Sequence, residues 1–113
     1  GSSPAPGTDI LRTVVGPMAR PVIERRLTEV GERLQRLRSD LAVADEQLAH
    51  LSADAEDARV RALVSETAQA GGVHRDAERH ARAMESHRDD LVAYIVRLEA
   101  TQDDLLDRMS LEG

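Results

Sequence analysis

Apolar side chains recur at alternating steps of four and three residues through the first half of the chain. They stand at Ile23, Leu27, Val30, Leu34, Leu37, Leu41, Ala44, Leu48, Leu51, Ala55, Ala58 and Ala62. This spacing places them along one stripe of an α-helix and is the heptad pattern of a coiled coil. The pattern runs for more than five repeats. It predicts one helix over residues 19–69, continuous through Ser52, although Asp54 and Glu56 there resemble a new helix start.

A second helix is predicted over residues 73–110. Met84, Leu91, Leu98 and Leu105 lie one heptad apart and define one row of its apolar stripe. The residues of the second row are not determined by the sequence, because at each position either of two neighbouring residues could belong to the stripe. These pairs are His87 and Arg88, Tyr94 and Ile95, and Thr101 and Gln102.

The segment between the two helices contains adjacent glycines. Gly71 and Gly72 can adopt the left-handed backbone that ends many helices, so a turn is predicted at residues 70–72. Helices joined by so short a turn pack antiparallel. The charge distribution also favours antiparallel packing, because it would place a basic segment beside an acidic one. Residues 20–38 hold six Arg and three Glu, whereas residues 89–112 hold seven acids and two Arg. The expected fold is all-α: an antiparallel two-helix coiled-coil hairpin, which could pair with a second copy as a four-helix bundle.

A turn at the glycines also predicts a register. It sets Leu37 against Leu105, Ala44 against Leu98, Leu51 against Leu91, and Ala55, Ala58 and Ala62 against His87, Met84 and His80. It brings Arg33 near Asp104 and Asp40 near Arg97. The alanines of the first helix would then leave room for larger side chains on the second.

The first 18 residues are predicted to be a flexible lead-in. The stretch "GSSPAPGT" is small and rich in Pro and Gly, and its leading Gly-Ser resembles the remnant of a cleaved tag. Asp9 could cap a short turn over residues 9–15 that places Ile10, Leu11, Val14 and Val15 on one side. Gly16 and Pro17 are expected to end that turn, and the main helix to begin near Ala19 to Pro21.

The amino-acid composition indicates a cell compartment and a source for the chain. The chain has 113 residues, no Cys, Phe or Trp, and Tyr94 as its one aromatic residue. No stretch is apolar enough for a membrane span or a signal peptide, and the lack of cysteine favours a reducing cytoplasm. All 15 basic residues are Arg, with no Lys, which is typical of GC-rich bacterial coding sequences.

No catalytic, cofactor-binding or metal-binding motif is visible, so a non-enzymatic role is expected. His80 and His87 are one heptad apart, about 10.5 Å along a helix, which is too far to share a metal ion. We expect them to be partly exposed residues of the stripe; a ligand or metal sensor built around them is the alternative. The net charge of −6 argues against nucleic-acid binding.

Apolar residues outside the stripe identify candidate contact surfaces. Val60, Leu63 and Val64 lie near the expected turn, and Val92, Val96 and Leu106 lie on the second helix. In the predicted register Ile23 and Leu27 have no partner, so a second copy, the residue 9–15 segment or another protein should cover them. The chain therefore reads as a protein-interaction or regulatory module that self-associates, or as a transcription regulator that binds a sigma factor or RNA polymerase.

Residues 24–109 resemble a family of small uncharacterised coiled-coil proteins from actinobacteria. The stretches that carry the resemblance are "ERRLTEVGERLQRLR", "ADEQLAHLSADAEDARVRALVSET" and "RLEATQDDLLDRM". The resemblance implies a bacterial helical hairpin, and no activity comes with it.

Overall fold

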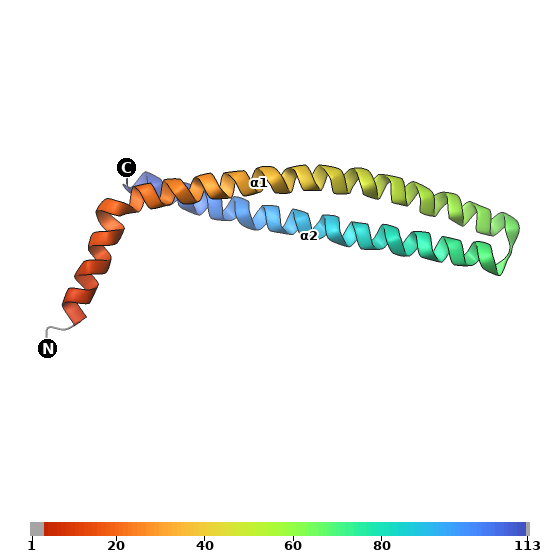
Figure 1. The fold of residues 1–113 in the computed structure, drawn as a ribbon, viewed down its shortest axis with the longest axis horizontal. Helices are drawn as coiled ribbons and strands as arrows, with labels where there is room; N and C mark the ends of the chain where they lie inside the picture. Colours follow the sequence, from red (N-terminus) through yellow and green to blue (C-terminus); the bar gives the residue numbers. More distant parts are fainter. Residues whose placement is uncertain (1–3, 113) are drawn as a thin grey trace. The chain divides into compact units, whose positions relative to one another are not determined.

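The chain folds as two α-helices in the part that the structure, a computed structural model, describes: residues 4–112, with the side chains of residues 19–111. Helix α1 spans Pro4–Ser65 and helix α2 spans Ala68–Glu112 (Figure 1). Contacts between the two helices make an all-α helical hairpin, which confirms the predicted fold class. The predicted continuity of the first helix through Ser52 is also confirmed.

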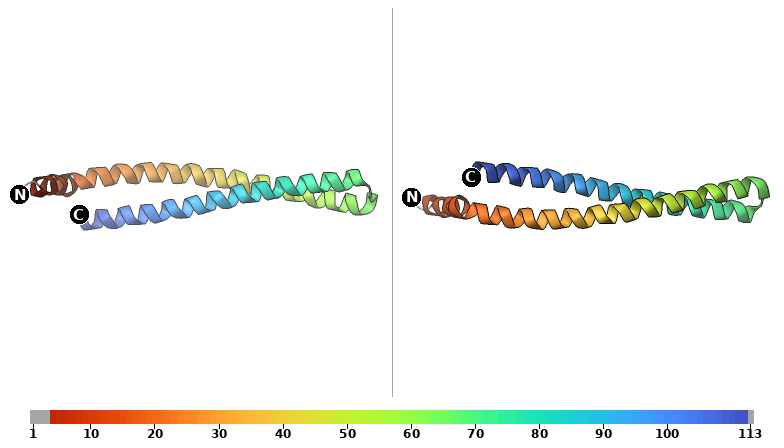
Figure 2. Two further views of the ribbon diagram at one scale, coloured as in Figure 1. Left: turned by 90° about the horizontal axis from the view of Figure 1, so that it is seen from below. Right: turned by 90° about the horizontal axis from the view of Figure 1, so that it is seen from above.

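The hairpin divides into two compact units, each built from a stretch of both helices. The turn unit is Arg36–Ile95, and the terminal unit combines the chain up to Gln35 with the chain from Val96 onward. Within each unit the stretch of α1 lies beside the stretch of α2, as the two views of Figure 2 show.

Helix α1 begins much earlier than the sequence pattern indicated. The prediction that this segment has no helix apart from a separate turn over residues 9–15 is wrong for residues 4–18, where the backbone is helical. Residues 1–3 of the predicted lead-in lie outside the described part of the chain. Pro17 removes one helical hydrogen bond, but a proline inside a helix can bend it without ending it. Figure 1 shows such a change of direction in the red-to-orange part of α1.

The stripe predicted on α1 is the buried face of that helix. Each of its twelve residues from Ile23 to Ala62 is buried or half-buried. Leu34 is the largest fully buried side chain among the described residues. Removal of such a side chain to alanine costs about 2–5 kcal/mol in other protein cores, so the seam is the main source of stability here.

The structure shows which residues of α2 form the second row of its apolar stripe, a point that the sequence left open. Twelve of its buried and half-buried positions follow the same alternation: Ala70, His74, Ala77, Ala81, Met84, Arg88, Leu91, Ile95, Leu98, Gln102, Leu105 and Met109. The other half-buried residues border this stripe: Gly71, Gly72, Glu78, Val92, Tyr94, Glu99 and Thr101. Arg88 therefore occupies the seam and His87 is exposed. Ile95 is buried beside a half-buried Tyr94.

The turn lies at Glu66 and Thr67, so its predicted position at residues 70–72 is wrong. Glu66 adopts a left-handed backbone with φ of 55°, and its N–H donates to the carbonyl of Ala62 at 3.0 Å. That is the bond of an αL helix end. Thr67 then caps α2, because its Oγ1 accepts a hydrogen bond from the Ala70 N–H at 3.1 Å. Gly71 and Gly72 are ordinary helical residues of α2.

Moving the turn also moves the register. Arg88 Nε donates to Asp45 Oδ1 at 2.8 Å across the two helices. Asp45 lies 20 residues before the end of α1 at Ser65, and Arg88 lies 20 residues after the start of α2 at Ala68. The predicted register placed Asp45 level with Arg97, so that register is wrong by nine residues.

Candidate functional site

The most exposed apolar cluster among the described side chains lies on the last two turns of α1. Val60, Leu63 and Val64, which we call the tip patch, are 46%, 64% and 81% exposed. Their spacing of three and four residues places them on one face of the helix. The heptad that carries Leu27 and Val30 at the seam puts that face on the opposite side of α1. The patch is thus directed away from α2 and is not part of the hairpin's own packing.

Two arginines stand on either side of the tip patch, and both are held back from it. Arg59 makes two hydrogen bonds to Glu56, from Nε at 3.0 Å and from Nη2 at 2.6 Å. Arg61 Nη2 lies 3.0 Å from Asp57 Oδ2. The acids precede their arginines by three and four residues, so both guanidinium groups lie toward the start of α1. The patch therefore stays uncovered.

The pKa values of the first pair reflect this arrangement. The hydrogen bond from Arg59 and then its positive charge lower the pKa of the Glu56 carboxyl, and the charge of His74 adds to that effect. The same carboxylate raises the pKa of Arg59. Both groups are solvent-exposed, so the pair fixes side-chain positions more than it stabilises the fold.

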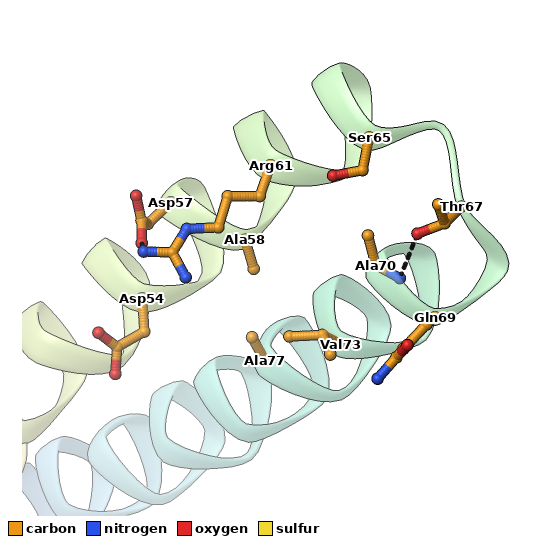
Figure 3. Close-up of a pocket in the computed structure, with 10 residues that line it drawn as sticks. All are labelled: Asp54, Asp57, Ala58, Arg61, Ser65, Thr67, Gln69, Ala70, Val73 and Ala77. Atoms are coloured by element: carbon orange, nitrogen blue, oxygen red, sulfur yellow. Dashed lines mark hydrogen bonds and ion pairs between the residues drawn. The ribbon is translucent and has the colours of Figure 1, made fainter.

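A shallow groove of about 500 Å³ runs between the helices beside the turn (Figure 3). Its apolar floor is formed by Ala58, Ala70, Val73 and Ala77, and its rim is formed by Asp54, Asp57, Arg61, Ser65, Thr67 and Gln69. Figure 3 shows Arg61 extending along α1 toward Asp57. The Thr67 hydroxyl is engaged as the cap of α2. The groove thus offers an ion pair, one further carboxylate and a small apolar floor.

Charged residues line a second, smaller groove of about 210 Å³ in the same unit. Ser52, Ala55, Glu56 and Arg59 contribute from α1, and His74, Glu78, Ala81 and Arg82 contribute from α2. His74 Nε2 lies 3.0 Å from Glu78 Oε1, and Arg82 Nη2 donates to Glu78 Oε2 at 3.4 Å. These contacts satisfy Glu78 within its own helix.

The two histidines singled out from the sequence lie outside the seam. His80 and His87 are exposed, and the half-buried histidine is His74. Ala58 lines a groove with Ala70, Val73 and Ala77, so the expected match of small α1 residues with Met84 and the histidines is wrong. Small residues face small residues near the turn. Within the described residues, no three His, Asp or Glu side chains are grouped so that they could hold a metal ion.

The other predicted contact residues have mixed outcomes. Ile23 is only 4% exposed and Leu27 is half-buried, so the premise that they lie bare is wrong. The cause is the register, since α2 continues to Glu112 and its end lies beside the orange part of α1 (Figure 1). Val92 is half-buried, whereas Val96 and Leu106 are exposed. Ile10, Leu11, Val14 and Val15 lie outside the described side chains.

Gly31 is a feature that the sequence reasoning missed. It sits half-buried in the middle of α1 with an ordinary helical backbone, where glycine costs about 1 kcal/mol relative to alanine. A Cβ atom built on Gly31 would meet nothing within 4 Å. Neither the backbone nor the packing of this chain requires glycine there. A mid-helix glycine outside the caps was the sequence feature that could have identified this position.

Comparisons with known proteins give no match to a family model, a curated protein or a solved structure. Across residues 4–112, neither helix has a stretch long and apolar enough to cross a membrane.

Proposed function

We propose that this chain is a non-enzymatic coiled-coil protein-interaction or regulatory module, and that the tip patch is its contact surface. The main support for this proposal is that Val60, Leu63 and Val64 are exposed together on the side of α1 that faces away from α2. Clustered apolar side chains of this kind are typical of binding surfaces, whereas scattered ones are not. The absence of cysteine fits work in a bacterial cytoplasm.

The size of the patch sets the kind of binding that it supports. Full burial of a Val or Leu side chain contributes about 1.5–3 kcal/mol. Three side chains that are half to mostly exposed therefore supply roughly 3–5 kcal/mol, which is comparable with the lower range of the cost of association. The patch is the centre of a contact that needs further residues around it, and it suits a reversible interaction.

Site-specific photocross-linking in the native cell tests this proposal. The photoreactive residue p-benzoylphenylalanine replaces Leu63 and, in a matched control, Val43, which is also an exposed apolar residue of α1. We expect a discrete light-dependent product from position 63 and none from position 43. Circular dichroism verifies that both variants remain helical. The absence of a product at 63, or equal products at both positions, would contradict the proposal.

A further inference from the structure

The larger groove beside the turn carries one carboxylate that has no partner. Two carboxylates, Asp54 and Asp57, and one guanidinium group, Arg61, line this groove, and α2 contributes no charged residue to its lining. Arg61 pairs with Asp57 at 3.0 Å. Within the described residues, Asp54 forms no hydrogen bond or ion pair. The groove therefore has one net negative charge, and its free carboxylate is Asp54.

The floor of the groove is apolar and open to solvent. Val73 is 56% exposed, and Figure 3 shows it on the side of α2 that faces the groove. Ala70 and Ala77 lie on either side of it, so the floor runs about 10 Å along α2, at about 1.5 Å per residue. The volume of about 500 Å³ is in the range of small-molecule sites. The floor thus has room for an alkyl chain.

The free carboxylate and the apolar floor are placed in line. Figure 3 shows Asp54 at the end of the groove away from the turn, with Ala77 and Val73 following toward the turn. All of these residues belong to the turn unit, Arg36–Ile95. A molecule that extends along the groove would meet a negative charge at one end and apolar side chains along its body.

We infer that this groove binds an organic ammonium ion with an apolar body, such as a protonated alkylamine. The ammonium group pairs with Asp54, and the alkyl chain covers Val73 and Ala77, whose apolar surface otherwise contacts water. A carboxylate ligand of the same shape would be repelled by Asp54. No residue of the tip patch lines the groove, so this inference goes beyond the proposed function and does not rest on it.

Three probes of one size test the charge and the floor separately. The purified chain is titrated with hexylammonium, hexanol or hexanoate, and amide chemical shifts are followed by NMR. We expect saturable shifts from hexylammonium at millimolar concentration, largest in residues 54–61 and 70–77, with weaker binding of hexanol and none of hexanoate at the groove. An equal response to hexanoate would overturn the inference. So would hexylammonium shifts that lie elsewhere or do not saturate.

A substitution of Asp54 tests the carboxylate. Asp54→Asn keeps the size of the side chain and removes its charge, so hexylammonium should bind about two- to fivefold more weakly, with hexanol unaffected. Asp40→Asn is the matched control, because Asp40 is an exposed carboxylate of α1 in the same unit and does not line the groove. Unchanged hexylammonium binding by Asp54→Asn would overturn the inference.

A substitution of Val73 tests the floor. Val73→Ser should weaken binding of both hexylammonium and hexanol about fourfold, the effect of one lost methylene contact. Val43→Ser is the control, since Val43 is 51% exposed and lies outside the groove. Both valines are exposed, so circular dichroism should show the fold intact. Equal effects of the two serine variants would mean that the alkyl chain does not lie on Val73, which would overturn the inference.

Discussion

Helix α1 ends at Ser65 because the next residue, Glu66, adopts a left-handed backbone, a conformation that is unfavourable for a residue with a Cβ atom. Its φ of 55° lies in the left-handed region, which costs a residue with a Cβ atom about 1–2 kcal/mol. Glycine avoids this cost but loses more entropy on folding. Glu66→Gly should therefore stabilise the hairpin by about 0.5–1 kcal/mol. Urea unfolding followed by circular dichroism measures the change.

Glu66→Ala is the control for that substitution. Alanine also lacks the carboxylate but keeps the Cβ atom, so it should leave the free energy of unfolding nearly unchanged. If Glu66→Gly proved no more stable than Glu66→Ala, the turn would lie elsewhere. The glycines at 71 and 72 would then regain the role that the sequence indicated.

At the scale of the helices, the Arg88–Asp45 bond implies a register that spin labels can measure. Labels at Ser52 and Ala81, which line one groove, should give a short distance by electron paramagnetic resonance. Labels at Ser52 and Asp90, which are level in the register predicted from sequence, should be clearly farther apart, because nine helical residues offset them by roughly 13 Å along the helix axis. A shorter distance for the second pair would refute the register and restore the turn at the glycines.

The seam of α1 could be predicted from sequence because burial of one stripe dictates its periodicity. From Ile23 to Ala62, the apolar pattern and the buried face agree residue by residue. The turn could not be predicted in the same way. A left-handed Glu66 and a Thr67 cap are local hydrogen-bonding choices, and the glycines that follow are the more common helix end.

The error in the turn spread to the rest of the candidate site. The register predicted from sequence was wrong by nine residues, and it left Ile23 and Leu27 without a partner on α2. In the structure Ile23 is buried and Leu27 is half-buried. It also placed His80 and His87 at the seam. Val60, Leu63 and Val64 were identified correctly as exposed because their exposure depends on the α1 heptad alone. Features of one helix are therefore predictable from its own pattern, and features between helices need the register.

For the molecule as a whole, the composition of the seam differs between the terminal unit and the stretch next to the turn. In the terminal unit the buried residues of α1 and α2 include Ile23, Val30, Leu34 and Leu105. Close to the turn, six seam residues are alanines, namely Ala55, Ala58 and Ala62 on α1 and Ala70, Ala77 and Ala81 on α2, and His74 is the larger residue among them. Because the free energy of burial scales with apolar area, each pair near the turn stabilises its helices less than a pair in the terminal unit.

This difference predicts unequal local opening along the hairpin. Amide hydrogens of residues 55–62 and 74–81 should exchange with solvent faster than those of residues 27–34 and 98–105, after correction for intrinsic rates. Leu34→Ala should speed exchange in the terminal unit, because it removes a side chain that is fully buried there. Hydrogen–deuterium exchange read by NMR resolves individual amides. Equal protection in the two units would mean that the hairpin opens as one cooperative unit and that seam composition does not set its local stability. Faster exchange near the turn would place the tip patch on the part of the molecule that rearranges most readily when a partner binds.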